Sequence, residues 1–151
     1  MANKKSDIKA KSTFVEKLTK RGFLNARVCS SPADICAEKD GVLWYFEIKM
    51  TRRSDNYFGA ATLTEWKQAI KDPEHFRFVV AQTLDDEQSF TFTEYTPEEF
   101  MEFSTVPPFK IFFNVNLDGT RRTSPKRTKS IGLSREIISA MASLFDELKE
   151  K

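Results

Sequence analysis

The 151-residue chain contains few of the residues on which several common kinds of site depend. It has one histidine, five glycines and two cysteines, and the glycines form neither a G-x-G-x-x-G sequence nor a Walker loop. A glycine-rich cradle for nucleotide phosphates therefore has no support, and we expect no nucleotide cofactor. A single histidine also argues against a histidine-ligated zinc site and a histidine-based catalytic triad.

Signals for export and membrane insertion are missing as well. No apolar run approaches the roughly 20 residues that span a bilayer, and segment 1–7 leads into no hydrophobic signal core. Cys29 and Cys36 are too few for a disulfide framework and form no C-x-x-C pair. We therefore expect a cytoplasmic protein in a reducing compartment, with no membrane partner.

The charges nearly balance over the whole chain. There are 24 Lys and Arg against 22 Asp and Glu, a formal net charge of +2. This total excludes a strongly basic nucleic-acid coat protein and a highly charged disordered chain. The length and the 40% hydrophobic content suit one domain that folds without metal or disulfide staples.

Hydrophobic periodicity and turn signals predict a mixed α/β fold, with a central mixed sheet flanked by helices. We expect one domain over residues 1–151, with a core at about 8–116, a basic loop at 118–133 and a C-terminal helix at 134–150. Strands are expected at 27–30, 76–82, 89–95 and 109–116, a hairpin at 34–50, and helices ending before Gly22 and spanning 63–72, 96–103 and 134–149.

Helix starts are marked by capping boxes. Thr62-x-x-Glu65 and Thr96-Pro-Glu-Glu99 each place threonine at the N-cap and glutamate three residues later. Thr13-x-x-Glu16 has the same spacing, so the first helix begins either there or earlier, near Ser6.

The hairpin carries the most informative pattern. Side chains alternate across a strand, so Val42, Trp44, Phe46, Ile48 and Met50 share one apolar face, and Glu47 and Lys49 lie on the other. Asp40-Gly41 is a strong two-residue turn signal. Folding the chain there pairs residues whose numbers sum to 81, which places Asp34 directly opposite Glu47.

Two opposed carboxylates destabilise a strand pair unless a cation lies between them. Mg²⁺ prefers oxygen ligands and commonly uses one or two protein carboxylates together with substrate phosphate. Asp34 and Glu47 are therefore candidate metal ligands, and Lys49 is placed to assist an attacking water. The alternative is a surface ion pair, with Asp34 acting only as a turn residue after Pro32.

The sequence Ser31-Pro-Ala-Asp34, followed by a hairpin and then Phe46-Glu-Ile-Lys49, resembles the PD-(D/E)xK motif of restriction-endonuclease-like nucleases. Lys49-x-Thr51, Phe58 and Thr64-Glu-Trp66 are similar to small NO VEIN-type and Mrr-like nuclease domains. The resemblance covers residues 12–95 and implies a restriction-endonuclease-like fold with a Mg²⁺-dependent phosphodiesterase activity, in which Mn²⁺ can substitute.

The resemblance also assigns roles to individual residues. It implies that Asp34, Glu47 and the backbone carbonyl of Ile48 hold the metal and that Lys49 positions or activates the water. Glu16 is the candidate acidic residue from the first helix, with its capping role as the alternative. Gln68 is the candidate accessory residue from the next helix, with an exposed helix glutamine as the alternative.

Basic and aromatic residues near the motif suggest where a DNA backbone would bind. Arg52 and Arg53 follow the lysine of the motif, and Tyr57 lies in the loop beyond them. A second cluster, which we rank below the first, consists of Arg121, Arg122, Lys126, Arg127 and Lys129. Such clusters suit salt-sensitive contacts to phosphates, although an isolated basic run is also typical of a solvated loop.

The sequence thus predicts a metal-dependent DNA endonuclease or exonuclease with an Asp/Glu/Lys site. Its expected partner is DNA, and the protein is expected to act as a homodimer or as part of a larger nucleoprotein complex. The alternative is a catalytically inactive subunit of the same fold that binds nucleic acid or protein in a defence, repair or mobile-element system. A third interpretation is an α/β protein in which the apposition of Asp34 and Glu47 is accidental.

Overall fold

The computed structural model describes residues 2–106, 117–118 and 133–150, apart from the side chains of Ala2 and Asn3. The chain divides into two compact units, Met1–Ser104 and Thr105–Lys151. The first unit contains the sheet and the candidate site, and the two units are described separately.

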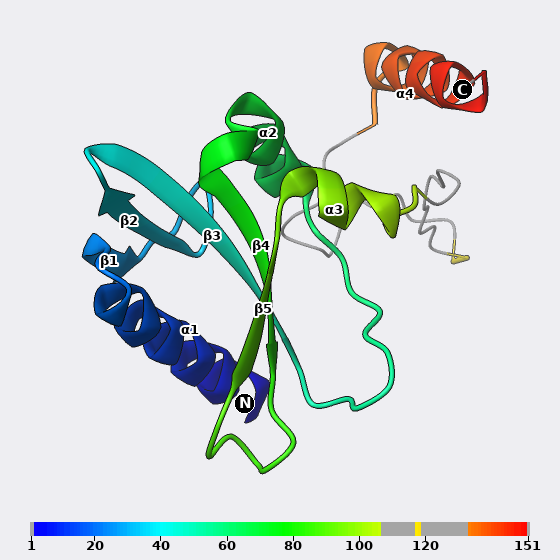
Figure 1. Cartoon of the computed structure of the whole chain (residues 1–151). Coiled ribbons are helices and arrows are strands. Elements are labelled where there is room, and N and C mark those ends of the chain that lie inside the picture. The colour runs from blue at the N-terminus through cyan, green and yellow to red at the C-terminus, as the bar shows by residue number, and fades with distance from the viewer. Residues whose placement is uncertain (1, 107–116, 119–132, 151) are drawn as a thin grey trace. The chain divides into compact units, whose positions relative to one another are not determined.

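A five-stranded mixed sheet forms the centre of the first unit (Figure 1). Its strands are β1 (Leu24–Val28), β2 (Ile35–Lys39), β3 (Val42–Thr51), β4 (Phe76–Gln82) and β5 (Thr91–Tyr95), which lie side by side in this order. Strands β3 and β4 are parallel, and the other neighbours are antiparallel. The parallel pair is possible because helix α2 (Leu63–Lys71) crosses over between β3 and β4. The predicted mixed sheet flanked by helices is confirmed.

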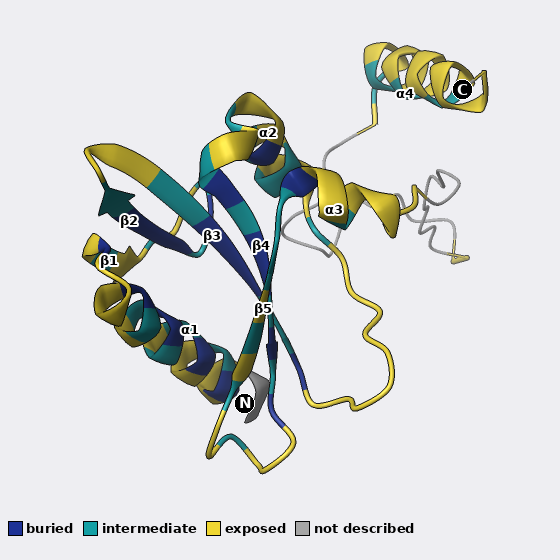
Figure 2. Cartoon of the chain, in the orientation of Figure 1, coloured by how far each residue is buried: buried dark blue, intermediate teal, exposed yellow. Residues whose placement is uncertain are grey.

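Helix α1 (Ala2–Lys20) covers one face of the sheet with an apolar stripe. Ala10, Phe14 and Leu18 recur at helical spacing and are completely buried, and they belong to one core cluster with Phe46 and Ile48 of β3. In Figure 2, buried and exposed positions alternate along α1. Because α1 is held along this stripe, the polar residues beside it have fixed positions relative to β3.

A second apolar cluster lies on the opposite face of the sheet. Helix α2 and helix α3 (Pro97–Glu102) contact β4 there, and a 3-10 turn, η1 (Pro73–His75), leads into that strand. Ala69 of α2 is buried with Phe76 and Phe78, and the ring of Phe100 stacks on Phe78. Glu47 and Lys49 project toward this α2 side, so both faces of β3 are covered.

The β2–β3 hairpin turns as the sequence predicts. Asp40 and Gly41 have φ values of 52° and 77°, the left-handed conformation that a type I′ turn requires at both central residues. The register pairs Ile35 with Phe46 and Lys39 with Val42. The predicted pairing rule is therefore confirmed from the turn to the pair of Ile35 and Phe46.

The first elements of the chain differ from the expectation. The first helix begins at Ala2, so Thr13 lies inside it and donates a hydrogen bond to the carbonyl of Lys9 (2.8 Å). The capping box proposed at Thr13 is therefore wrong, because helical periodicity continues upstream through the residues that contact the sheet. Strand β1 also begins and ends earlier than the expected strand at 27–30.

The two cysteines form a disulfide, although neither their number nor their spacing predicts one. Cys29 follows β1, Cys36 lies in β2, and the bond between them closes the segment that contains Asp34. The Ser31-Pro32 peptide bond within this segment is cis.

The remaining helix boundaries agree with the sequence. Capping boxes start α2 at Thr62 and α3 at Thr96, and Ser134 caps α4 (Arg135–Lys149) by accepting a hydrogen bond from the Ile137 amide. Within the described part of the chain, no helix combines the length and hydropathy needed to cross a membrane. The strand expected at 109–116 and the basic cluster at 121–129 lie outside the described residues.

Candidate metal centre

Asp34 occupies the position that the pairing rule predicts. It directly precedes β2, and continuing the register beyond Ile35 and Phe46 places it opposite Glu47. Its Oδ2 accepts a hydrogen bond from the Ile48 amide (3.0 Å), and its carbonyl accepts one from the Cys29 amide (2.7 Å). The carboxylate is therefore anchored to β3, while its backbone is tied to the end of β1.

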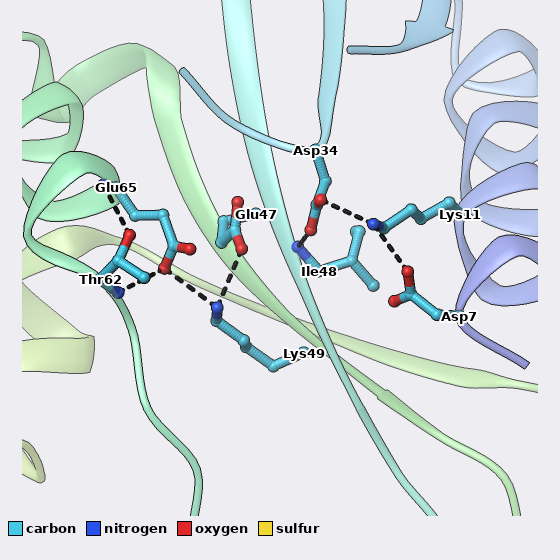
Figure 3. A network of polar contacts seen from close by, with 8 residues as sticks. All are labelled: Asp7, Lys11, Asp34, Glu47, Ile48, Lys49, Thr62 and Glu65. Carbon is cyan, nitrogen blue, oxygen red and sulfur yellow. Dashed lines mark hydrogen bonds and ion pairs between the residues drawn. The ribbon is translucent and has the colours of Figure 1, made fainter. Parts of the chain in front are cut away.

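Helix α1 supplies a lysine to the same carboxylate. Lys11 Nζ lies 2.7 Å from Asp34 Oδ1 and 2.8 Å from Asp7 Oδ2, one helical turn earlier (Figure 3). Only 18% of the Lys11 side chain is exposed. The two oxygens of Asp34 thus have different partners, a β3 amide and the ammonium group of Lys11.

On the α2 side, Lys49 lies between two carboxylates. Its Nζ is 2.9 Å from Glu47 Oε1 and 3.0 Å from Glu65 Oε2 (Figure 3). Glu65 is the N3 residue of the α2 capping box, and the same Oε2 accepts a hydrogen bond from the Thr62 amide (2.8 Å). Glu65 therefore closes the capping box of α2 and also contacts Lys49.

Burial dominates the protonation chemistry of Glu47, which is 5% exposed. Desolvation raises the pKa of its carboxyl group to about 8, and the nearby charges of Asp34 and Glu65 act in the same direction. The hydrogen bond from Lys49 opposes this shift but does not cancel it. Glu47 is a buried acid whose ionised form lacks sufficient compensating positive charge.

The neighbouring groups are shifted toward their charged forms. Burial lowers the pKa of Lys49, but its bonds to Glu47 and Glu65 outweigh burial and leave that pKa raised. The pKa of Lys11 is likewise raised, because its bonds to Asp34 and Asp7 outweigh burial. For Glu65, the bonds from Lys49 and the Thr62 amide overcome desolvation and leave the pKa lowered.

The network contains more acidic groups than basic ones. The carboxyl groups of Asp7, Asp34, Glu47 and Glu65 face two ammonium groups, those of Lys11 and Lys49. Full ionisation would leave two negative charges, which one divalent cation would balance. Among the described residues, no three or more His, Cys, Asp or Glu side chains are arranged to hold a metal ion. The donor set instead fits a hard cation bound by two carboxylates and further oxygen ligands.

Ile48, Glu16 and Gln68 are the other residues that the sequence assigns to the site. The Ile48 amide bonds to Asp34, so its backbone lies on the edge of β3 that Asp34 occupies. Glu16 is exposed on α1, and the acidic residue of α1 that joins the network is Asp7. Gln68 is half-buried one turn beyond Glu65, the α2 residue that contacts Lys49.

The proposed DNA contacts after β3 are partly engaged within the protein. Arg52 forms an ion pair with Glu87 and donates to the Ser6 hydroxyl (2.6 Å), and Arg53 pairs with Asp55 (3.3 Å). Tyr57 is 40% exposed in the same loop. These side chains line the exposed segment 52–60 between β3 and α2, and both arginines form ion pairs within the protein.

Comparisons with known proteins do not identify a relative. The chain matches no family model, no curated protein and no solved structure. The candidate site must therefore be judged by its own geometry.

Sequence reasoning missed two members of the network and one contact. Lys11 and Asp7 have the i, i+4 spacing of an ion pair on one helix face, but nothing local indicates that this face meets Asp34. Glu65 is recognisable from sequence as a capping residue, and only the three-dimensional arrangement reveals its second contact, with Lys49.

Proposed function

We propose that the protein is a metal-dependent nuclease that hydrolyses phosphodiester bonds in DNA. The observation that carries the proposal is the convergence of Asp34, Glu47 and Lys49 at the end of the β2–β3 hairpin that lies away from its turn. Burial and neighbouring carboxylates raise the Glu47 pKa to about 8, and a bound divalent cation would relieve this unfavourable charge. A purely structural surface pair would not require a carboxyl group that is 5% exposed.

Each residue of the site has a separate role in the proposed reaction. Asp34 and Glu47 would hold Mg²⁺ or Mn²⁺, and the Ile48 carbonyl is a further candidate ligand because its backbone lies on the Asp34 edge of β3. The bound ion would supply Lewis acidity and a water of lowered pKa. The ammonium group of Lys49, held by Glu47 and Glu65, would orient the attacking water and balance charge on the phosphoryl group.

The order of elements supports membership of the PD-(D/E)xK superfamily as part of this proposal. A helix precedes the motif, the apolar strand β3 carries Glu47 and Lys49, and α2 and β4 follow. Asp34 directly precedes β2, the other strand of the hairpin, as the motif requires. The assignment to this superfamily therefore rests on the local pattern of the hairpin and not on overall similarity to a known protein.

The proposal is tested with a panel of DNA substrates. Wild-type protein is incubated with single-stranded, nicked, branched and duplex DNA in Mg²⁺ or Mn²⁺, alongside Glu47→Ala, Lys49→Ala and the control Glu102→Ala. We expect cleavage by wild type and by Glu102→Ala, with a loss of at least about 100-fold in both site variants. Equal product formation by wild type and both site variants on every substrate would refute the catalytic assignment.

A second candidate function is a DNA-binding subunit without catalytic activity. The observation that favours it is the closed network of contacts, in which both Asp34 oxygens and the Lys49 ammonium group already have protein partners. DNA binding without metal-dependent cleavage on any substrate of the panel would support this candidate over the nuclease.

A further inference from the structure

The contact between Lys11 and Asp34 places a protein cation at the candidate metal centre. Lys11 Nζ lies 2.7 Å from Asp34 Oδ1, and Asp34 Oδ2 already accepts the Ile48 amide hydrogen. The ammonium group thus contacts the Asp34 oxygen that no backbone amide of β3 occupies. Figure 3 shows Lys11 approaching Asp34 from α1, on the side away from Lys49.

We propose that Lys11 and a divalent cation compete for Asp34, and that the ammonium group displaced from Asp34 binds a phosphate of the substrate. This inference rests on the proposed nuclease function. It gives Lys11 two positions, one on Asp34 in the metal-free protein and one on DNA in the metal-loaded protein.

Electrostatics favours exclusive occupancy of Asp34 by one cation. An ammonium group in contact with a carboxylate repels a divalent ion that binds the same oxygen, and partial burial reduces the screening of this repulsion. Lys11 and Asp34 are only 18% and 20% exposed. If a metal ion replaces the ammonium group, the negative charge of Asp34 faces a cation both before and after the exchange.

The position of α1 determines how the exchange occurs. Ala10 and Phe14 flank Lys11 in sequence and are completely buried, so the helix cannot withdraw without opening the core. The lysine stem has four rotatable bonds and can redirect its ammonium group while the helix stays in place. Asp7 lies one turn away and remains a partner for Lys11 during this movement.

Metal binding alone tests the first half of the proposal. Mn²⁺ affinity is measured by titration calorimetry for wild type, Lys11→Met, Lys11→Gln and Lys11→Arg, with Lys9→Met as the matched control. Lys9 is exposed on the same helix and interacts electrostatically with Glu87. We expect Lys11→Met and Lys11→Gln to bind Mn²⁺ roughly tenfold more tightly than wild type. Lys11→Arg and Lys9→Met should remain within about twofold of wild type.

DNA binding tests the second half. Affinity for a short duplex is measured in Mn²⁺ in the Lys49→Ala background, which blocks cleavage, with and without Lys11→Met. Removal of one cation that binds phosphate should weaken binding several-fold and reduce the salt dependence of log K by about 0.9. Circular dichroism of each variant establishes that it is folded, and Lys11→Gln replaces Lys11→Met if the latter is not.

The outcomes separate this inference from the proposed function. Equal or weaker Mn²⁺ binding by folded Lys11→Met and Lys11→Gln, with wild type still binding and cleaving, overturns the inference and leaves the nuclease intact. Unchanged DNA affinity and salt dependence in the Lys49→Ala background also overturn it. If neither wild type nor any Lys11 variant binds Mn²⁺, the proposed function and the inference both fail.

Discussion

At the residue scale, Glu47 connects the chemistry of the candidate site to the stability of the sheet. It is buried in β3 at 5% exposure, on the face of the strand that points toward α2. Its raised pKa means that the metal-free fold favours the neutral carboxyl group. Burial of Glu47 therefore costs stability whenever its carboxyl group is ionised and no cation compensates the charge.

This cost predicts a pH dependence of folding in EDTA. The folded pKa of Glu47, about 8, exceeds its ordinary value of 4.5, so the folded state binds more protons between these pH values. Stability should be greatest below about pH 4.5 with respect to this group and should fall as pH rises toward 8. Relative to Glu47→Gln, wild type should lose on the order of 2 kcal/mol across this window.

Urea denaturation at several pH values measures the effect, and Glu102→Gln, which removes an exposed carboxylate of α3, is the control. Parallel stability curves for wild type and Glu47→Gln would contradict a raised Glu47 pKa. Saturating Mn²⁺ should reverse the trend, because metal binding requires the ionised carboxyl group.

The position of a site residue could be predicted from sequence where residues close to it in the chain determine that position. Strand alternation and the Asp40-Gly41 turn bring Asp34 opposite Glu47, and these signals lie within 14 residues of one another. Lys11 lies 23 positions before Asp34 on a different element, so its contact depends on how α1 packs on the sheet. No periodicity within α1 specifies that arrangement.

At the element scale, the segment between β1 and β2 determines where Asp34 is held. The Cys29–Cys36 disulfide closes this segment, and the hydrogen bond from the Cys29 amide to the Asp34 carbonyl lies inside the closed loop. The segment has no regular secondary structure of its own from Cys29 to Ala33. The conformation of this segment therefore depends on the disulfide and on this hydrogen bond more than on the intrinsic propensities of its residues.

Removal of the disulfide should loosen Asp34. Cys29→Ser/Cys36→Ser is expected to lower the free energy of unfolding by about 2 kcal/mol, since a short covalent loop is opened. It should also weaken Mn²⁺ binding several-fold, because one ligand becomes less well positioned. Thermal melts and calorimetry on the double variant, on Ser30→Ala and on oxidised and reduced wild type measure both effects. Identical melting and identical Mn²⁺ affinity in all four samples would contradict the role given to this loop.

The elements themselves differ in how far sequence determines them. The capping boxes at Thr62 and Thr96 predicted the starts of α2 and α3 because each cap is formed by residues three positions apart. Thr13-x-x-Glu16 has the same spacing but lies within α1, where burial of Ala10 and Ser6 extends the helix toward Ala2. Packing against the sheet overrides a local start signal, and the same dependence shifts the bounds of β1.

At the scale of the whole molecule, the near-neutral charge conceals an asymmetry between the two units. Residues 1–104 carry 15 Lys and Arg against 17 Asp and Glu, whereas residues 105–151 carry nine against five. The candidate metal centre thus belongs to the net negative unit, and the net positive unit contains the basic cluster at 121–129. A polyanionic substrate would gain more from the second unit than the sequence ranking of basic residues suggests.

This asymmetry predicts which residues dominate the salt dependence of DNA binding. Arg52 and Arg53 are already paired with Glu87 and Asp55, so these carboxylates compete with phosphate for both arginines. Replacement of both by glutamine should therefore change the slope of log K against log salt by less than about one unit. Glutamine at all five basic positions of the cluster should reduce the slope by about 0.9 for each phosphate that is no longer neutralised; these positions are Arg121, Arg122, Lys126, Arg127 and Lys129.

The slope of log K against log salt is measured by fluorescence anisotropy with a labelled duplex, in the Lys49→Ala background. Salt is varied over roughly 50–200 mM, the range over which such slopes are resolved. A larger effect of the Arg52 and Arg53 pair would restore the ranking made from sequence and would require Glu87 and Asp55 to release these arginines to DNA. A larger effect of the cluster would mean that the positive unit supplies most of the affinity and the negative unit the chemistry. In that case the acidic residues around Glu47, which repel DNA, would be tolerated because binding is provided elsewhere in the chain.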